Sequence, residues 1–329
     1  AFLHNFIGSA ALSLALKSGL IDKLNEGGQS IANLAAASKL DLKGVALLAD
    51  LLDSAGVVSQ HRGVLELTPA FTAVLGRRAA LQSKLAFLDL AARDTLDRLP
   101  AMLFDTGAYI ASGEVFKLFR YDRAKTISPE DIAFTRRWVD YTTALSEHEG
   151  PLLAPLMDLR ETRRLLDVGG NSGAFARALC AANPALTVTV LDLPAVVEIG
   201  SRYVAAFSEA PRVSFAIADI RRDPLPAGHD AICFKSVLHD WPDDDVGAFL
   251  VRAHDALPPG GRLFIAERGE FTTGGVPLPY SATANLAFSR FYRPAGHYAV
   301  LLSKLGFADV SMKSVQIEMP FHVTVGTRP

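Results

Sequence analysis

The sequence predicts an α/β protein with a doubly wound, mostly parallel sheet that follows a mainly helical N-terminal region. From about residue 160 onward, short apolar runs alternate with stretches of helical periodicity. That alternation is typical of a parallel sheet covered by helices. Before residue 158, apolar residues recur mostly at helical spacing. We therefore expect two domains, 1–95 and 96–329, the second with a helical segment 96–157 and a core 158–329.

Composition excludes several classes of protein. Half of the 329 residues are hydrophobic and the net charge is −2, which favours a globular chain with a substantial core. The charges are mixed without a basic stripe, so the sequence favours neither nucleic acid nor an anionic membrane as a partner. Cys180 and Cys233 lie within apolar patterns, which favours reduced core cysteines in a cytoplasmic protein.

The first hundred residues predict three helices followed by two short strands, the pattern of a winged helix. The helices are expected over Ala10–Leu24, over Ser30–Ser38 with Ser30 as its cap, and from a cap at Asp41 to a stop at Gly56. The strands flank the turn at 61–63. Winged helices often bind DNA, but the third helix carries a single lysine near its start, Lys43, and is otherwise apolar and acidic. Its composition is better suited to packing against a second copy of the chain.

Residues 80–157 predict further helices, with looser segments around Gly107 and Gly113. Ser128 followed by Pro129 opens a helix that carries an aromatic stripe including Trp138 and Tyr141. We then expect the following strands, the last two forming a hairpin: Arg164–Val168, Thr187–Leu191, Val213–Ile217, Ala231–Lys235, Arg262–Glu267, Asp309–Gln316 and Phe321–Gly326.

The segment Leu165–Leu193 predicts a nucleoside site. A strand ends at Asp167, a glycine turn and a helix follow, and the next strand ends at Asp192. An acid there can accept hydrogen bonds from ribose hydroxyls. The dinucleotide pattern G-x-G-x-x-G fails, because Asn171 and Ser172 stand where its second glycine is needed. The turn instead resembles the D-x-G-x-G-x-G turn of S-adenosylmethionine-dependent methyltransferases, with Asn171, which tolerates left-handed backbone, in the middle. A purely structural glycine turn is the alternative.

Four stretches together resemble the homodimeric small-molecule O-methyltransferases of plant phenolic and bacterial natural-product pathways. They read LLDVGGNSG, VLDLP, FKSVLHDWPDDD and ALPPGGRLFIAE. The N-terminal pattern is similar to that family's winged-helix dimerisation module. The resemblance implies a class I methyltransferase core, S-adenosylmethionine as cofactor, a small-molecule acceptor and a homodimer. The resemblance implies that Gly169 and Gly170 face the methionine portion, that Asp192 holds the ribose hydroxyls, and that Asp219, Ile220 and Lys235 lie at the adenine. It also implies that Asp167 and Leu193 bind the cofactor.

The same resemblance implies that His239 is the catalytic base and that Glu267 orients it. The chemistry supports these roles, because methyl transfer to oxygen requires removal of a proton, and a histidine suits that task at neutral pH. His239 follows the expected strand Ala231–Lys235 and Glu267 ends the expected strand Arg262–Glu267, so they share the carboxyl edge of the sheet, where such folds bind ligands. No cluster has metal-ligand spacing, and we expect no metal.

The chain departs from the plant members in its acceptor region. Tyr292 stands where those proteins place a second glutamate, and Trp138 stands where they keep a methionine. We expect the acceptor pocket to include Trp138, Tyr141, Phe288, Tyr292 and His297. These changes favour a bacterial natural-product enzyme. They leave open methyl transfer to nitrogen or carbon, another use of the cofactor, and a DNA-binding regulator that senses the nucleoside.

Overall fold

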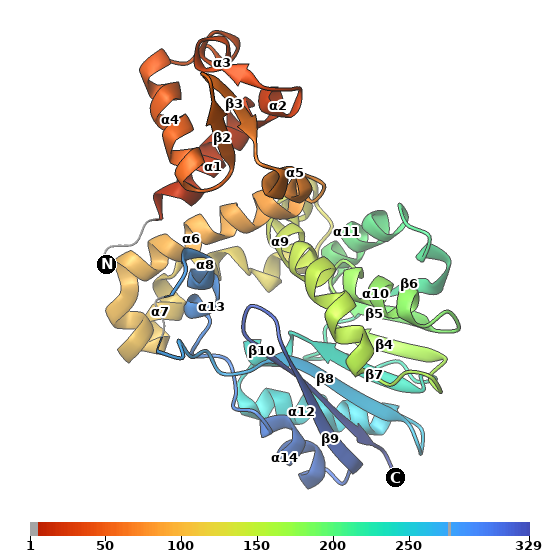
Figure 1. Ribbon diagram of the computed structural model, residues 1–329. Helices are drawn as coiled ribbons and strands as arrows, with labels where there is room; N and C mark the ends of the chain where they lie inside the picture. The colour runs from red at the N-terminus through yellow and green to blue at the C-terminus, as the bar shows by residue number, and fades with distance from the viewer. Residues whose placement is uncertain (1–5, 276–277) are drawn as a thin grey trace. The chain divides into compact units, whose positions relative to one another are not determined.

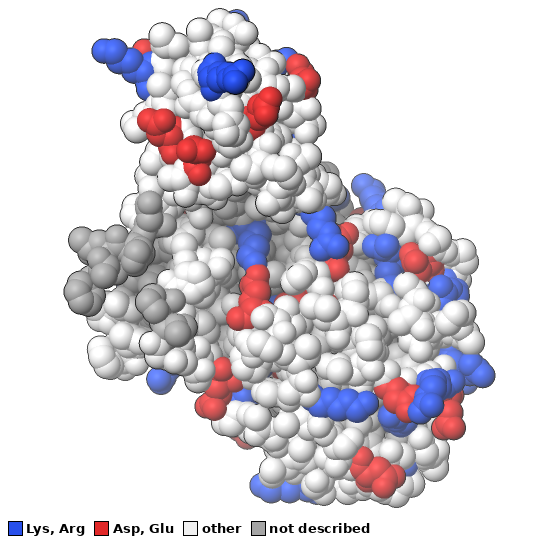
Figure 2. All heavy atoms as spheres, in the orientation of Figure 1, with Lys and Arg blue, Asp and Glu red and all other residues white. Residues whose placement is uncertain are grey.

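The computed structural model describes residues 6–275 and 278–329 (Figure 1). The chain forms two compact units, Ala1–Arg93 with Pro279–Thr283, and Asp94–Leu278 with Ala284–Pro329. The change from one to the other falls within the long helix α6, Arg78–Phe104. No described helix is both long and apolar enough to cross a bilayer. On the face drawn in Figure 2, acidic and basic side chains are interspersed.

The first unit is a helical bundle with a small antiparallel sheet. Its helices are α1 (Ile7–Lys17), α2 (Leu20–Asn25), α3 (Ile31–Ser38), α4 (Leu42–Ser54) and α5 (Pro69–Leu75), and η5 (Tyr280–Ala282) joins them. Its strands β1 (Gln29–Ser30), β2 (Val58–His61) and β3 (Val64–Leu67) pair in the order β1-β3-β2. Ser30 and Asp41 cap α3 and α4 as predicted. The helix expected over Ala10–Leu24 is two helices, because Gly19 between them has a φ of 77°.

In the second unit, helices precede the sheet. They are α7 (Thr106–Ser112), α8 (Glu114–Leu118), the short 3₁₀ helix η1 (Tyr121–Lys125), α9 (Pro129–Leu153) and η2 (Ala154–Leu156). Gly107 lies inside α7 rather than in a looser segment. The start of α8 after Gly113 is fixed by Asp94, which is fully buried. Its carboxylate accepts the backbone N–H groups of Glu114 and Val115, the first two residues of the helix, at 2.9 and 2.7 Å.

The seven-stranded sheet confirms the predicted fold class. Its strands are β4 (Arg164–Val168), β5 (Thr187–Asp192), β6 (Val213–Ile217), β7 (Ala231–Lys235), β8 (Arg262–Arg268), β9 (Ala308–Gln316) and β10 (Pro320–Thr327). They run in the order β6-β5-β4-β7-β8-β10-β9. The first five are parallel, and β10 is antiparallel to both of its neighbours. The remaining helices are α10 (Ala174–Ala182), α11 (Pro194–Val204), η3 (Ala210–Arg212), η4 (Leu238–Asp240), α12 (Asp243–Ala256), α13 (Thr283–Ala287) and α14 (His297–Lys304).

Two hydrophobic cores cover the two faces of this sheet. Along β7, Ala231 and Cys233 pack into the core that includes the end of α9 and α10, whereas Ile232 and Phe234 pack into the core with α12 and α14. Side chains alternate between the faces of a strand. The same alternation turns Lys235, at the carboxyl end of β7, toward α9.

Candidate active site

A cavity of about 390 Å³ opens at the carboxyl ends of the parallel strands, wholly within the second unit. Its lining comes from the turns after β4, β5, β6 and β7, from α8, η1 and α9, and from the segment that contains α13. Open α/β sheets bind ligands at this edge. The cavity therefore lies where the sequence predicted a ligand site.

The turn after β4 has the backbone that the sequence predicted. Gly169 and Asn171 take φ values of 68° and 57°, so an asparagine adopts the left-handed conformation in place of a glycine. A Cβ on Gly170 would lie 2.5 Å from Asp167 Oδ2, which explains why a glycine is needed there. The turn thus brings backbone directly to the wall of the cavity.

Of the two acids in this turn region, Asp167 is buried and Asp192 is partly buried, and they differ in their hydrogen bonds. Asp192 accepts the backbone N–H groups of Asn171 and Leu193 at 2.8 and 2.7 Å. Burial raises its pKa to about 6, against the effect of those hydrogen bonds. The carboxylate of Asp167 accepts a hydrogen bond from none of the described residues, and burial raises its pKa to about 7. Asp167 therefore has hydrogen-bonding capacity left for a ligand.

Asp219 and Ile220 line the cavity after β6. Arg221 binds the Asp219 carboxylate with both arms of its guanidinium, at 2.8 and 2.7 Å, and Lys125 of η1 lies 3.3 Å away. These cations lower the pKa of Asp219 to about 2, the hydrogen bond from Arg221 being the largest cause. Asp219 is thus an ionised hydrogen-bond acceptor in the part of the cavity that is lined by the turn after β6.

Lys235 lines the same cavity from the carboxyl end of β7. In the sheet, β7 lies beside β4. The Lys235 ammonium group lies 2.5 Å from Glu149 of α9 and 3.2 Å from Ser146 Oγ. Arg268 binds the other oxygen of the same carboxylate. Lys235 is therefore part of a buried ion network with Glu149 and Arg268.

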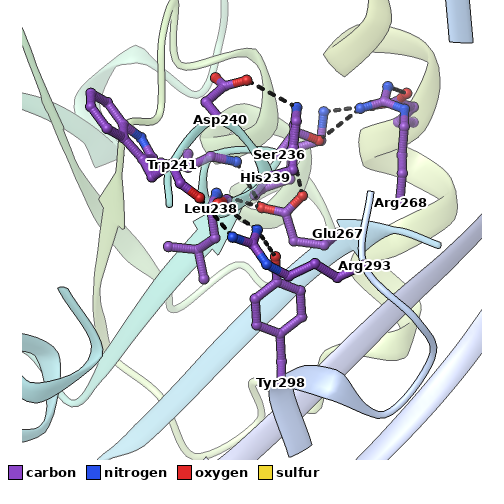
Figure 3. Close-up of polar contacts among 12 residues, drawn as sticks. Ser236, Leu238, His239, Asp240, Trp241, Glu267, Arg268, Arg293 and Tyr298 are labelled. Carbon is purple, nitrogen blue, oxygen red and sulfur yellow. Dashed lines mark hydrogen bonds and ion pairs between the residues drawn. The ribbon is translucent and has the colours of Figure 1, made fainter. Parts of the chain in front are cut away.

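His239 and Glu267 form the pair that the sequence predicted (Figure 3). Glu267 Oε2 lies 2.7 Å from His239 Nδ1, while Oε1 accepts the backbone N–H groups of Val237 and Leu238 at 2.8 and 2.7 Å. Burial tends to raise the pKa of Glu267, but the imidazole and these N–H groups outweigh it and the pKa is lowered. An ionised carboxylate only accepts, so Nδ1 carries the hydrogen. Nε2 of the neutral ring consequently holds a lone pair.

Arg293 fixes the loop that carries the imidazole (Figure 3). Its guanidinium donates to the carbonyl oxygens of Leu238 and Trp241 at 2.8 and 2.6 Å, and to Asp243 at 2.9 Å. At the start of the loop, Ser236 has a φ of 55°. A residue other than glycine in this conformation is strained, and such strain is common at functional sites.

The outer part of the cavity is aromatic. Four of the residues expected there, Trp138, Tyr141, Phe288 and Tyr292, line it. The structure does not bring His297 to this wall: it begins α14, where its ring lies 5.3 Å from that of Tyr298. That helix packs on β9 and β10, away from the cavity.

Several residues of the site were missed from the sequence. Phe116, Phe119 and Tyr121 reach the cavity from α8, η1 and the residues between them, a segment without a recognisable motif. Asp240 lies next to His239 and lines the same wall, so its place in the L-H-D-W block was a usable signal.

Comparison with known proteins shows extensive similarity. A family model described as an O-methyltransferase domain matches residues 124–308. Demethylspheroidene O-methyltransferase of Rhodobacter capsulatus is 37% identical over 162 residues, which cover 47% of this chain and 39% of that protein. The 3-hydroxy-5-methyl-1-naphthoate 3-O-methyltransferase of Streptomyces sahachiroi is 43% identical over 115 residues, 35% of this chain and 33% of that protein. Each alignment thus spans less than half of the relative's length.

Among solved structures, the S-adenosylmethionine-dependent methyltransferase SibL in its apo form superimposes with a TM-score of 0.66 at 25% identity. This match covers 98% of this chain and 96% of SibL. The structural likeness therefore extends over both units.

Proposed function

Because the chain belongs to the O-methyltransferase domain family, whose members use S-adenosylmethionine, we propose that it methylates a hydroxyl group of a small, aromatic acceptor with His239 as the general base. Membership of the family confirms the resemblance that the sequence showed. The observation that carries the proposal is the 2.7 Å contact between Glu267 and His239 Nδ1 in the wall of the cavity.

The residues around the cavity fit the cofactor. The unpartnered, buried carboxylate of Asp167 and the close backbone of Gly169 and Gly170 suit the methionine portion, with its ammonium group. Asp192 suits the ribose hydroxyls, since each of its oxygens has a lone pair beyond the one used by a backbone N–H. Leu193, Asp219 and Ile220 line the end that would receive the adenine. When bound, S-adenosylmethionine supplies an electrophilic methyl group.

The chain's own contribution is to position the acceptor and to take up its proton. His239 Nε2 accepts the hydroxyl proton as the new oxygen–carbon bond forms, and Nδ1–H remains bound to Glu267. Glu267 stabilises the positive imidazolium and fixes the ring's tautomer. Arg293 holds the backbone on both sides of the imidazole, so that its orientation is set before the acceptor binds.

The walls favour an aromatic acceptor. Trp138 contacts Phe119 and Tyr121, with ring centroids 6.1 and 5.7 Å apart, and Phe288 contacts Phe119 and Phe116 at 5.8 and 6.0 Å. Such a wall offers stacking and edge contacts to a planar ring. The hydroxynaphthoate named for one relative has this chemistry.

The test is methylation of a panel of phenols and hydroxynaphthoates, read by mass spectrometry and paired with calorimetry of S-adenosylmethionine. We expect the mass of one methyl group to be gained on oxygen, and His239→Gln to lower kcat by about 10² to 10⁴ with cofactor affinity preserved. His254→Gln is the matched control, because His254 lies on α12 and its ring contacts Phe307, away from the cavity. Full turnover in His239→Gln would refute the assignment of the base.

We also propose that the first unit mediates a homodimer. Leu14 of α1 and Leu42 and Leu47 of α4 are more than half exposed, at 54%, 53% and 60%. Exposed leucines on helices favour a partner of the same kind. Sedimentation equilibrium of the whole chain tests this, with Leu47→Lys expected to raise the monomer fraction and Lys17→Leu as a control. A monomer at micromolar concentration would contradict it.

A further inference from the structure

The imidazole of His239 faces a second carboxylate besides Glu267. Asp240 Oδ1 lies 3.4 Å from His239 Nε2, on the nitrogen that takes up the proton (Figure 3). Tyr292, which stands where the plant relatives' second glutamate was expected, supplies no charge; its ring centroid lies 5.5 Å from that of His239. Asp240 is thus the acid that flanks the ring opposite Glu267.

Within its own element, η4, the Asp240 carboxylate contacts the His239 ring that it flanks. Its side chain is 28% exposed, so rotation into solvent is open to it. The restraint comes from a residue 119 positions away: the hydroxyl of Tyr121 donates to Asp240 Oδ2 at 2.6 Å. A hydrogen bond of this length to a charged acceptor is among the stronger ones in proteins.

Tyr121 is itself held on several sides. Its ring stacks on Trp241, with centroids 6.0 Å apart and an interplanar angle of 25°, and meets Trp138 edge-on at 5.7 Å. The other end of its 3₁₀ helix is tied to the floor of the cavity by the ion pair of Lys125 with Asp219. The Tyr121 hydroxyl therefore has a fixed location, and its hydrogen bond restrains the position of the Asp240 carboxylate.

We propose that Tyr121 is a positioning residue for the methyl transfer: its hydroxyl keeps the Asp240 carboxylate against His239 Nε2, where that carboxylate stabilises the imidazolium. This inference rests on the proposed function. As the acceptor's oxygen forms its bond to the methyl carbon and the sulfur–carbon bond breaks, the hydroxyl proton passes to Nε2. The imidazolium then lies between two carboxylates.

The charges around the ring agree with this role. The groups that face His239 are Glu267 and Arg268 from β8, Asp240 from η4, Tyr292 from the loop after α13, and Tyr121 beyond Asp240 from η1. Burial tends to lower the pKa of His239, but Asp240 and then Glu267 outweigh burial and Arg268, so the pKa is raised. Loss of the tether would let Asp240 turn to solvent and lower the pKa of His239.

The experiment is an NMR titration of His239 in the cofactor-free protein, assigned by comparison with His239→Gln, together with the pH dependence of kcat/KM. In Tyr121→Phe we expect the pKa of His239 to fall by about one unit and the acid limb of kcat/KM to move to lower pH by the same amount. Asp240→Asn should give a similar fall, and the double variant should show no further change. Tyr203→Phe is the matched control, because the Tyr203 hydroxyl also donates to a carboxylate, Glu147 at 2.7 Å, outside the cavity.

An unchanged or raised pKa of His239 in Tyr121→Phe would overturn the proposal. So would a further fall when Tyr121→Phe is added to Asp240→Asn, or a rise in acceptor KM without any change in the pH profile, which would mean that Tyr121 contacts the acceptor itself. The titration needs no turnover. If the protein methylates no acceptor, the proposed function is refuted, but the titration still tests whether Tyr121 holds Asp240 against His239. If Asp240→Asn does not fold, the pKa of His239 in Tyr121→Phe is sufficient for that test.

Discussion

Replacing Glu267 by glutamine should disable the base while leaving the fold intact. The carboxylate accepts three hydrogen bonds, two from backbone N–H groups and one from His239 Nδ1. A glutamine of the same shape has one accepting oxygen and one donating nitrogen. If the oxygen faces the backbone, the amide N–H₂ meets Nδ1–H, and the imidazole must move its hydrogen to Nε2. If the amide is reversed, two backbone N–H groups lose their acceptor.

The cost follows from these contacts. A hydrogen bond to a charged group contributes about 1.5 to 3 kcal/mol, and an unsatisfied buried donor costs about 1 to 3 kcal/mol. In the orientation that keeps both backbone hydrogen bonds only the first cost applies, so about 1.5 to 3 kcal/mol of imidazolium stabilisation is lost, which corresponds to roughly 10 to 10² in kcat.

The assay is single-turnover methylation of Glu267→Gln at saturating acceptor, with the His239 tautomer read from ¹⁵N shifts. Glu147→Gln, on the outer surface of α9, serves as the control. A loss of activity of less than about fivefold, or a wild-type tautomer, would refute the role given to Glu267.

Three further predictions test other parts of the site. Burial raises the pKa of Asp167 to about 7, so between its unfolded value and pH 7 the folded chain binds more protons and the free energy of unfolding falls as pH rises. In melts without cofactor, Asp167→Asn should therefore gain about 2 to 4 kcal/mol at pH 8 and little at pH 4, whereas an equal effect at both values would contradict this. Arg293→Lys loses the fork that binds the carbonyls of Leu238 and Trp241, and we expect kcat to fall about tenfold with cofactor affinity unchanged by calorimetry. Trp138→Met should raise acceptor KM more than it lowers kcat, and a change confined to kcat would remove Trp138 from the acceptor wall.

Much of the second unit could be predicted because each strand has a strong local signal. The expected bounds of β4, β6 and β7 agree with the observed ones, since their apolar runs end in a charged residue or a turn. The first unit was harder. Gly19 divides one apolar pattern into two helices because its backbone is left-handed. The spacing of apolar residues carries no information about that backbone conformation.

The site contacts that the sequence missed join residues far apart in the chain. The sequence placed Lys235 at the cofactor, but it gave no sign of its ion pair with Glu149, 86 positions away. Tyr121 and Asp240 meet across 119 positions. No local motif encodes such contacts, because they depend on how α9 and η1 pack against the sheet.

If the proposed function holds, the segment after α13 links acceptor recognition to the position of the His239 loop. Phe288, Phe291 and Tyr292 line the aromatic part of the cavity, and the very next residue, Arg293, binds the backbone carbonyls of Leu238 and Trp241 on both sides of His239. Substitutions at Phe288, Phe291 and Tyr292 can therefore change which acceptors bind. A substitution of Arg293 would instead loosen the loop that holds the His239 imidazole. Libraries built to alter substrate preference should randomise the aromatic positions and hold the adjoining guanidinium constant.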